Sequence, residues 1–326
     1  MQRRPVGHPG LETQDPPSQT EGGAPVVSYT SKRMFRRKLF KVKLPTRELE
    51  LGRRTLVMGV LNVTPDSFSD GGKFAWLEAA VAASLEMERA GADILDIGAE
   101  STRPGSKGIS AAEELTRLLP VLEALQRRLK IPMSVDTRKA AVAEIALGAG
   151  AEMLNDVSGL RFDARLAEVA AKHGVPLILM HMRGTPETMQ KLPFAKDVMR
   201  EVVSGLRKSL GMARRAGVAR SQILLDPGIG FGKSFAQNYE LLAKLPEVAK
   251  LGYPVLVGTS RKGFIGKTLE SKDGKPVGPG ERLWGTAATV AASILNGAHM
   301  VRVHDVAEMA QVCRVADAIA DSRSHK

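Results

Sequence analysis

The stretch LVMGVLNVTPDSFSDGG, residues 56–72, decides the fold of this chain. It begins with a nearly continuous apolar run that stops at Asn62, as is typical of a short strand buried on both faces. The polar residues that follow, from Thr64 to Gly72, are too many for a simple turn between a strand and a helix. The stretch therefore predicts a buried strand that carries a loop of functional groups to one edge of a sheet.

The pattern of a short apolar strand, a polar loop and an amphipathic helix recurs seven more times. Strands are predicted at 55–61, 92–98, 131–136, 151–156, 175–182, 222–228, 253–262 and 298–305. Helices are predicted near 75–90, 111–129, from 137, and near 163–173, 195–216, 235–249, 281–297 and 306–321. Such crossovers place helices on the faces of a parallel sheet. Eight similar units predict an α/β fold closed into a (β/α)8 TIM barrel, and an open doubly wound sheet is the alternative.

The N-terminal region differs from the rest of the chain. Residues 1–28 are rich in Pro and Gly and lack a periodic apolar face, so we expect a disordered tail, and we extend this basic, Pro-rich segment to residue 38. Residues 39–51 alternate apolar and polar side chains around Pro45, which predicts a short hairpin beneath the barrel. Residues 39–326 are thus predicted to form a single barrel domain.

Charge and composition narrow the classes of function. The chain carries a formal net charge of +12, of which +7 falls within residues 1–54. A basic nucleic-acid-binding protein using residues 31–54 is disfavoured, because only Phe35 and Phe40 interleave that basic run and aromatic residues make up 4% of the chain. The single cysteine, Cys313, excludes a disulfide framework. Because no apolar run approaches the length of a membrane span, we expect a cytoplasmic protein without a membrane or nucleic-acid partner.

Polar side chains follow nearly every predicted strand. In a TIM barrel the carboxyl ends of the strands and the loops after them meet at one mouth, so these side chains should converge there. The candidates at the strand ends are Asn62, Asp96, Asp136, Asn155, His181, Asp226, Ser260, Lys262, Arg302 and His304.

Two familiar motifs are absent from the glycine-rich segment DPGIGFGKS, residues 226–234. A phosphate-binding P-loop would need Gly where Pro227 stands, and a dinucleotide fingerprint would need Gly at Lys233. The histidines show no zinc-binding spacing either, because His181 and His304 belong to different strands. The glycines instead allow the backbone to approach a flat ligand beside Asp226.

Eight segments in order resemble the dihydropteroate synthase family of pterin-binding TIM barrels. They are NVTPDSFSDGG at 62–72, DIGAESTRPGS at 96–106, SVDTRK at 134–139, NDVSG at 155–159, LMHMRGTPETMQ at 179–190, LDPGIGFGK at 225–233, GTSRKGFIG at 258–266 and RVHDV at 302–306. The resemblance implies that the chain joins a dihydropterin diphosphate to 4-aminobenzoate and releases pyrophosphate. It also implies Mg2+, a homodimer and a place in folate biosynthesis.

The resemblance assigns a role to each matching residue. For the pterin it implies Asp136, Asn155, Asp226 and Lys262. For the diphosphate it implies Asn62, Thr102, Arg103, Arg302 and His304, with Asn62 beside Mg2+. For 4-aminobenzoate it implies Phe68, Thr102, Pro104 and Ser260, together with Arg103. The groups expected to act in catalysis are Arg302, His304, Lys262 and Arg103.

These residue types suit the chemistry. A pterin edge presents N–H donors that a buried carboxylate accepts in pairs, and a carbonyl that needs a donor such as Lys262. Departure of diphosphate leaves cationic character on the pterin, so charge stabilisation and positioning suffice without a protein nucleophile. Arg302 can bind phosphate oxygens in a bidentate way, and His304 would add charge if protonated.

A pterin-binding methyltransferase acting on a corrinoid partner is the competing enzyme class. It shares the barrel and the Asp-Asn-Asp pterin set, so Asp136, Asn155 and Asp226 do not separate the two. Diphosphate chemistry is favoured by the loop STRPGS at 101–106, by Ser-Arg-Lys at 260–262, and by Arg302 with His304.

Overall fold

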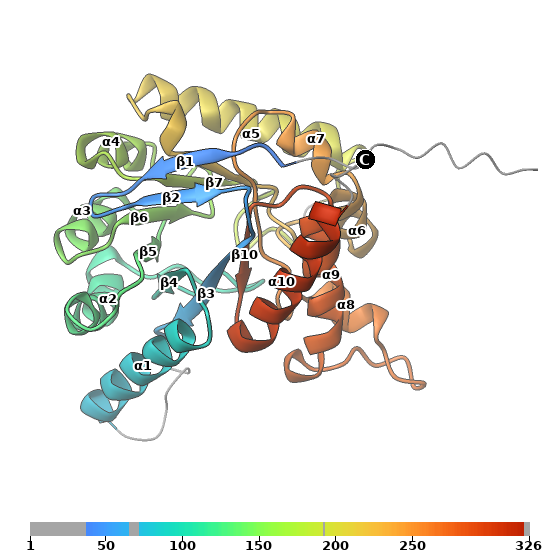
Figure 1. The fold of residues 1–326 in the computed structure, drawn as a ribbon, viewed down its shortest axis with the longest axis horizontal. Coiled ribbons are helices and arrows are strands. Elements are labelled where there is room, and N and C mark those ends of the chain that lie inside the picture. The colour runs from blue at the N-terminus through green and yellow to red at the C-terminus, as the bar shows by residue number, and fades with distance from the viewer. Residues whose placement is uncertain (1–36, 65–71, 192, 323–326) are drawn as a thin grey trace, which may run out of the picture. The chain divides into compact units, whose positions relative to one another are not determined.

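Eight parallel strands form the centre of the molecule, and helices surround them (Figure 1). The computed structural model describes residues 37–64, 72–191 and 193–322. The strands of the barrel are β3 (Leu56–Asn62), β4 (Ile94–Gly98), β5 (Met133–Asp136), β6 (Met153–Asp156), β7 (Leu177–Met180), β8 (Ile223–Asp226), β9 (Leu256–Val257) and β10 (Met300–Val303).

The sheet closes on itself. Its strand order is β8-β7-β6-β5-β4-β3-β10-β9, and every neighbouring pair is parallel. The two ends of this series meet where Leu225 bridges Val255, and the Leu225 N–H donates to the Pro254 carbonyl at 2.9 Å. The predicted (β/α)8 barrel is therefore confirmed, and the open doubly wound sheet is excluded.

The helices follow the predicted series, except that the helix predicted from 137 begins at Ala140, the one predicted at 235–249 is split, and an additional helix follows β9. They are α1 (Gly72–Arg89), α2 (Ala111–Gln126), α3 (Ala140–Gly148), α4 (Arg165–His173), α5 (Val198–Arg215), α6 (Phe235–Ala243), α7 (Leu245–Ala249), α8 (Gly263–Thr268), α9 (Leu283–Leu295) and α10 (Val306–Ser322). The helix predicted at 235–249 is split at Lys244, because Pro246 lacks the N–H that a continuous helix would need. The strand predicted at 253–262 is limited to β9, and the chain after it forms α8.

The amino-terminal hairpin packs against the end of the barrel at which the strands begin. Strands β1 (Phe40–Lys43) and β2 (Glu48–Leu51) pair antiparallel, as predicted from residues 39–51. Val42, Leu44 and Leu51 are buried in one cluster with inward-facing barrel residues such as Met58 and Ile94. The hairpin therefore closes the apolar end of the barrel.

The chain contacts the barrel slightly before the predicted domain boundary. Arg37, assigned by the sequence to the tail, donates to Thr55 Oγ1 at 2.7 Å and to Asp317 Oδ1 at 2.6 Å. Its guanidinium also donates to the Ala298 carbonyl at 3.2 Å. The rest of the predicted tail lies outside the described residues, so its disorder stays a prediction.

The inward faces of the strands change from apolar to polar along the barrel axis. Side chains alternate between the two faces of a strand, so a residue two positions further on points the same way. In four strands an apolar inward residue is followed by a polar one: Ile94 by Asp96, Met153 by Asn155, Leu224 by Asp226, and Met300 by Arg302. The fold thus places a charged layer directly above an apolar layer.

None of the helices in the described part of the chain is long and apolar enough to span a bilayer.

Leu44 tests the contribution of the hairpin to stability. Leu44→Ala removes a side chain that is 1% exposed, so we expect the free energy of unfolding to fall by about 2–5 kcal/mol. Leu39→Ala is the matched control, because Leu39 is 59% exposed, and it should change stability by about 0.5 kcal/mol or less. Urea denaturation measures both variants, and an equal effect would contradict the role given to the hairpin.

Candidate functional site

Arg302 of β10 reaches across the barrel mouth to two carboxylates in the charged layer, one on β4 and one on β5. Its Nε donates to Asp96 Oδ2 at 2.6 Å, and its Nη2 donates to Asp136 Oδ2 at 2.9 Å. Asn155 donates its side-chain Nδ2 to the same Asp96 oxygen at 2.9 Å. The strands β4, β5, β6 and β10 are therefore joined through their inward side chains, and four of the predicted strand-end groups do converge.

Asp96 is the hydrogen-bond acceptor shared by two members of this cluster. Its side chain is fully buried, and one oxygen, Oδ2, accepts from both Arg302 and Asn155. The other oxygen, Oδ1, has no partner among the described residues. The sequence placed Asp96 at the mouth but gave it no role; the structure makes it the residue that orients Arg302 and Asn155.

Asp226 at the end of β8 holds the glycine-rich segment that follows it. Its Oδ1 accepts the Gly228 N–H at 2.6 Å. Gly228 has φ +69°, and a Cβ there would lie 1.9 Å from the His181 carbonyl oxygen, so only glycine fits. This turn brings Phe231 beneath Lys262, whose Nζ lies 4.0 Å from the ring centroid. Lys262 and Asp226 thus belong to the same corner of the mouth.

Burial shifts the ionisation of the central groups. It raises the pKa of Asp136 to about 7, although the Arg302 guanidinium opposes the shift, and it raises the pKa of Asp226 to about 6. Burial also lowers the pKa of Lys262 to about 8, helped by the positive charge of Arg302. The two carboxyl groups are therefore partly protonated near neutral pH, and a ligand that donates hydrogen bonds to them would favour their charged forms.

His304 and Ser260 form a pair beside this cluster. The Ser260 hydroxyl lies 3.0 Å from His304 Nδ1 and accepts the His304 backbone N–H at 3.2 Å. Burial, with the nearby charges of Arg302 and Arg261, lowers the pKa of His304 to about 4. At neutral pH the imidazole is thus uncharged, so in this state it offers a hydrogen bond rather than the charge that a protonated histidine would add.

The loop after β4 carries Thr102, Arg103 and Pro104. The Ser106 hydroxyl lies 2.6 Å from the Ser101 carbonyl and 2.7 Å from that of Arg103. The Gly105 N–H donates to the Pro186 carbonyl at 2.9 Å, which joins this loop to the one after β7. Arg103 and Pro104 are exposed, as is Asn62 at the end of β3, and Thr102 is half-buried. Phe68, the remaining residue predicted for the site, lies outside the described residues.

Lys233 is a buried group whose position the sequence did not reveal. Its ammonium lies 2.8, 3.0 and 3.1 Å from the carbonyl oxygens of Gly228, His181 and Phe231. Burial lowers its pKa to about 7. His181 faces the same amine, with Nδ1 at 3.1 Å, and packs against Gly205 of α5, so it points away from the charged layer. The only sign of this residue in the sequence was the Gly-Lys pair of DPGIGFGKS. In the structure, Lys233 stabilises the turn around Gly228 by donating to its carbonyl.

No group of three or more His, Cys, Asp or Glu side chains within residues 37–64, 72–191 and 193–322 is arranged to hold a metal ion. A metal at this mouth would therefore need oxygen ligands from elsewhere, such as an amide side chain and a substrate phosphate.

Comparisons with known proteins agree with this geometry. A family model described as pterin binding enzyme matches residues 58–304. A dihydropteroate synthase from Synechocystis sp. is 52% identical over 268 residues, which cover 82% of this chain and 91% of that protein.

Solved structures give the same result. The dihydropteroate synthase of Xanthomonas albilineans with 4-aminobenzoic acid is 43% identical, with a TM-score of 0.79 over 86% of this chain and 98% of that one. A dihydropteroate synthase from Clostridium difficile, determined in the presence of pteroic acid, is 47% identical with a TM-score of 0.77. That match covers 82% of this chain and 98% of the other.

Proposed function

The chain belongs to the pterin-binding enzyme family, and we propose that it catalyses the dihydropteroate synthase reaction. In this reaction a 6-hydroxymethyl-7,8-dihydropterin diphosphate and 4-aminobenzoate give 7,8-dihydropteroate and pyrophosphate, a step of folate biosynthesis. The observation that carries the proposal is the set of Asp136, Asn155, Asp226 and Lys262 at the barrel mouth, in which Asn155 and Asp226 are buried and Asp136 and Lys262 are half-buried.

The pterin is assigned to this set of four residues. Its N–H groups donate to the carboxylates of Asp136 and Asp226, and its ring carbonyl accepts from Lys262. Asn155 is oriented by its bond to Asp96, so its amide is held ready beside Asp136. The raised pKa values of the two carboxyl groups then fall when the ligand binds, because hydrogen bonds to a carboxylate favour its charged form.

The diphosphate is assigned to the cations and loops around that pocket. Arg302 uses Nε and Nη2 for Asp96 and Asp136, and neither bond uses Nη1, which we assign to a phosphate oxygen. The leaving group is proposed to contact four further residues: His304, Arg103, Thr102 and Asn62. 4-Aminobenzoate is assigned to Thr102, Pro104 and Ser260, with Phe68 from the first loop.

Mg2+ is proposed to bind together with the diphosphate, with Asn62 as its protein ligand. Asn62 is exposed at the end of β3, and an amide oxygen is the hard type of ligand that Mg2+ prefers. Mg2+ usually keeps several waters and is held by substrate phosphates rather than by a cage of protein side chains, which fits the donor set here. The ion would neutralise charge on the departing diphosphate.

The corrinoid methyltransferase alternative shares the Asp136, Asn155 and Asp226 set, so those residues do not test it. Arg103 in the loop after β4, and the Ser260–His304 pair after β9 and β10, provide polar groups around the mouth where a diphosphate would leave. Together with the relatives described above, these groups favour the synthase reaction.

Pyrophosphate release tests the function. The purified chain should release pyrophosphate only when the pterin diphosphate, 4-aminobenzoate and Mg2+ are all present. Asp226→Asn removes the charge that accepts the pterin donors, so we expect kcat/KM to fall about tenfold to a hundredfold, as for loss of a charge-assisted hydrogen bond. Asp273→Asn, an exposed carboxylate in the loop after α8, should leave it unchanged. Absence of pyrophosphate from the wild-type reaction would reject the proposal.

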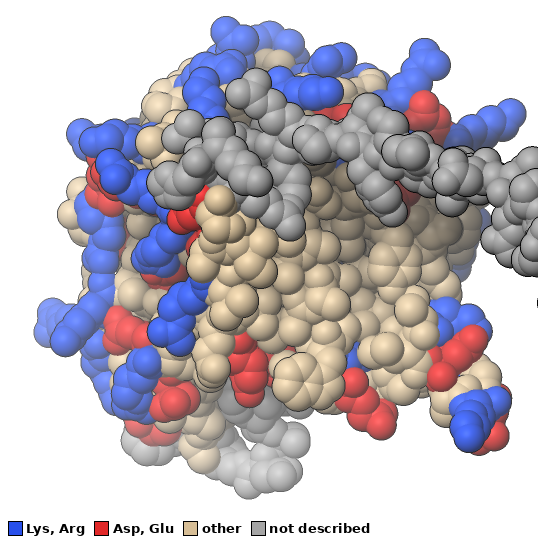
Figure 2. Space-filling model, turned by 45° about the vertical axis from the view of Figure 1, so that its right-hand side comes forward, with Lys and Arg blue, Asp and Glu red and all other residues tan. Residues whose placement is uncertain are grey.

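We further propose a homodimer that forms through α9. This helix, Leu283–Leu295, contains no charged residue, and its Trp284 is 79% exposed. Figure 2 shows a broad uncharged area on the side of the molecule where α8, α9 and α10 lie in Figure 1. Exposed apolar surface of this kind is typical of an interface between subunits. A cytoplasmic location is also proposed, and the single cysteine, buried Cys313, is compatible with a reducing compartment.

Substitution on α9 tests the dimer. Ala288→Arg adds a charge to the exposed side of this helix and should shift the sedimentation coefficient from that of a dimer to that of a monomer. Ala112→Arg on α2 is the control and should remain dimeric. A dimer that survives Ala288→Arg, or a wild-type monomer, would contradict the proposed interface.

A further inference from the structure

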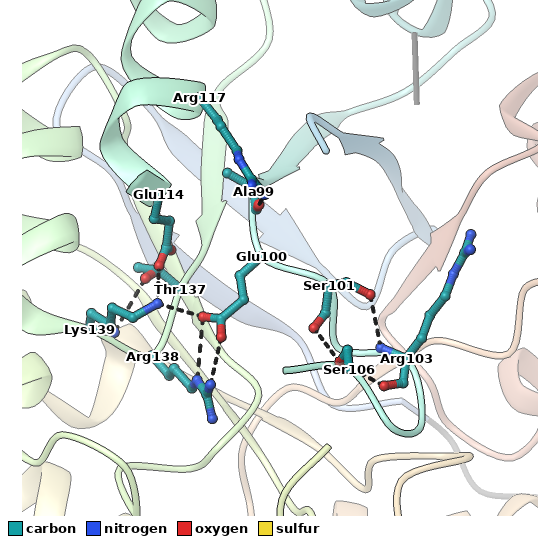
Figure 3. Close-up of polar contacts among 10 residues, drawn as sticks. All are labelled: Ala99, Glu100, Ser101, Arg103, Ser106, Glu114, Arg117, Thr137, Arg138 and Lys139. Carbon is teal, nitrogen blue, oxygen red and sulfur yellow. Dashed lines mark hydrogen bonds and ion pairs between the residues drawn. The ribbon is translucent and has the colours of Figure 1, made fainter. Parts of the chain in front are cut away.

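Glu100 lies at the base of the loop after β4 and is held by two cations (Figure 3). Its Oε1 accepts from Arg138 Nη2 at 2.6 Å, and its Oε2 accepts from Lys139 Nζ at 2.6 Å. The side chain is 7% exposed. Because both partners follow β5, this one carboxylate ties the loop after β4 to the turn between β5 and α3.

The same network extends to α2 and to the segment before α4. The Lys139 ammonium lies between Glu100 and Glu114, whose side chain is fully buried in the first turn of α2 (Figure 3). Arg138 places its guanidinium 4.1 Å from the ring centroid of Phe162. The network therefore fixes the base of the loop from three directions.

The network balances its own charge. Glu100 and Glu114 supply two negative charges, and Arg138 and Lys139 supply two positive ones. Burial opposes ionisation of Glu100, but the hydrogen bonds from Arg138 and Lys139 outweigh it and hold its pKa below the usual range. Removing either the carboxylate or its cationic partner would leave a buried charge without a counter-charge, which is energetically costly, so the pairing is expected to persist.

This network lies between two parts of the proposed active site. Glu100 precedes Thr102 and Arg103 by two and three residues, and Arg138 follows Asp136 by two. The space around the pair is tight, because a Cβ on Gly108 would lie 2.8 Å from Arg138 Nη2 and 3.0 Å from Glu100 Oε1. Figure 3 shows the Arg103 side chain directed away from the network, so Glu100 constrains the backbone of the loop without contacting Arg103 itself.

We propose that Glu100 is a positioning residue, which acts through Arg138 to hold the loop carrying Thr102, Arg103 and Pro104 in register with the pterin-binding carboxylate Asp136. The proposal rests on the synthase function given above. It assigns to Glu100 the assembly of the 4-aminobenzoate site rather than the binding of the pterin. The pterin set does not depend on Glu100, because Asp136 is fixed by β5 and by Arg302.

The substitution Glu100→Gln removes the charge with little change in size. We expect the KM for 4-aminobenzoate to rise about tenfold, while the Kd for a pterin, measured by calorimetry, changes less than twofold. Arg138→Met should have the same effect. If Glu100 acts through Arg138, the double variant should be no worse than the more impaired single variant.

Glu144→Gln is the matched control. Glu144 also contacts two basic side chains, Lys172 Nζ at 2.6 Å and His173 Nε2 at 3.0 Å, but it joins α3 to α4 rather than the loop. It should leave both the KM and the pterin Kd unchanged. Melting temperatures of all four variants show whether a kinetic change reflects loss of fold.

Hydrogen exchange tests the loop without relying on turnover. The amides of residues 101–108 should exchange about tenfold faster in Glu100→Gln, while those of β5 and β6 stay protected. An unchanged exchange rate, an unchanged KM or an equal loss of pterin affinity would overturn the proposal. A wild-type chain that releases no pyrophosphate would reject the synthase function instead, and the exchange result would still decide whether Glu100 orders the loop.

Discussion

The contact of Arg302 with Asp96 and Asp136 is the interaction on which the site depends. It brings a guanidinium and two carboxylates from β10, β4 and β5 into one layer, in which Asp96 is fully buried and Arg302 and Asp136 are partly exposed at the mouth. Burial disfavours the charged form of Arg302, but Asp96 and Asp136 outweigh this and raise its pKa, so the cation is retained. Removal of Arg302 would leave fully buried Asp96 without its counter-charge, which is strongly destabilising in proteins.

The barrel can support this layer because its other half is apolar. The interior beneath it is filled by side chains such as Met58, Met153 and Met300, and the hairpin adds Leu44 and Leu51. The half of the barrel nearer the hairpin therefore contributes mainly to stability, and the half at the mouth carries the functional groups. Polar groups of the upper layer need to bind only one another and a ligand, while the lower layer supplies the hydrophobic burial that offsets the cost of keeping charges inside.

The sequence predicted those features that repeat along the chain. The eightfold alternation was enough to establish the barrel, and the polar residues at strand ends correctly placed Asp136, Asn155, Asp226 and Arg302 at one mouth. The direction of single side chains could not be predicted in the same way. His181 lies at a strand end but faces α5, because side chains alternate along β7 and Ile178, three residues earlier, points into the barrel.

Contacts between residues far apart in the sequence could not be predicted from the repeating pattern either. Asp96 and Arg302 are separated by 206 residues, and Glu100 and Arg138 by 38, so neither pairing has a local signal. Lys233 was recognised only as part of a motif that failed, because burial of its amine depends on the turn at Gly228. The split at Pro246 could be foreseen from proline chemistry, whereas the apolar run YPVLV at 253–257 gave no local signal that β9 would be limited to Leu256–Val257.

The account holds that the buried carboxyl groups ionise when the pterin binds, and proton release measures this directly. Asp136 and Asp226, with pKa values raised to about 7 and about 6, are largely or partly protonated in the free enzyme at pH 6. Calorimetry in buffers of different ionisation enthalpy should therefore show release of about one proton per pterin at pH 6, and almost none at pH 8.5. Asp226→Asn should reduce the release. Uptake of protons, or none released at pH 6 after correction for the titration of the pterin itself, would contradict the account.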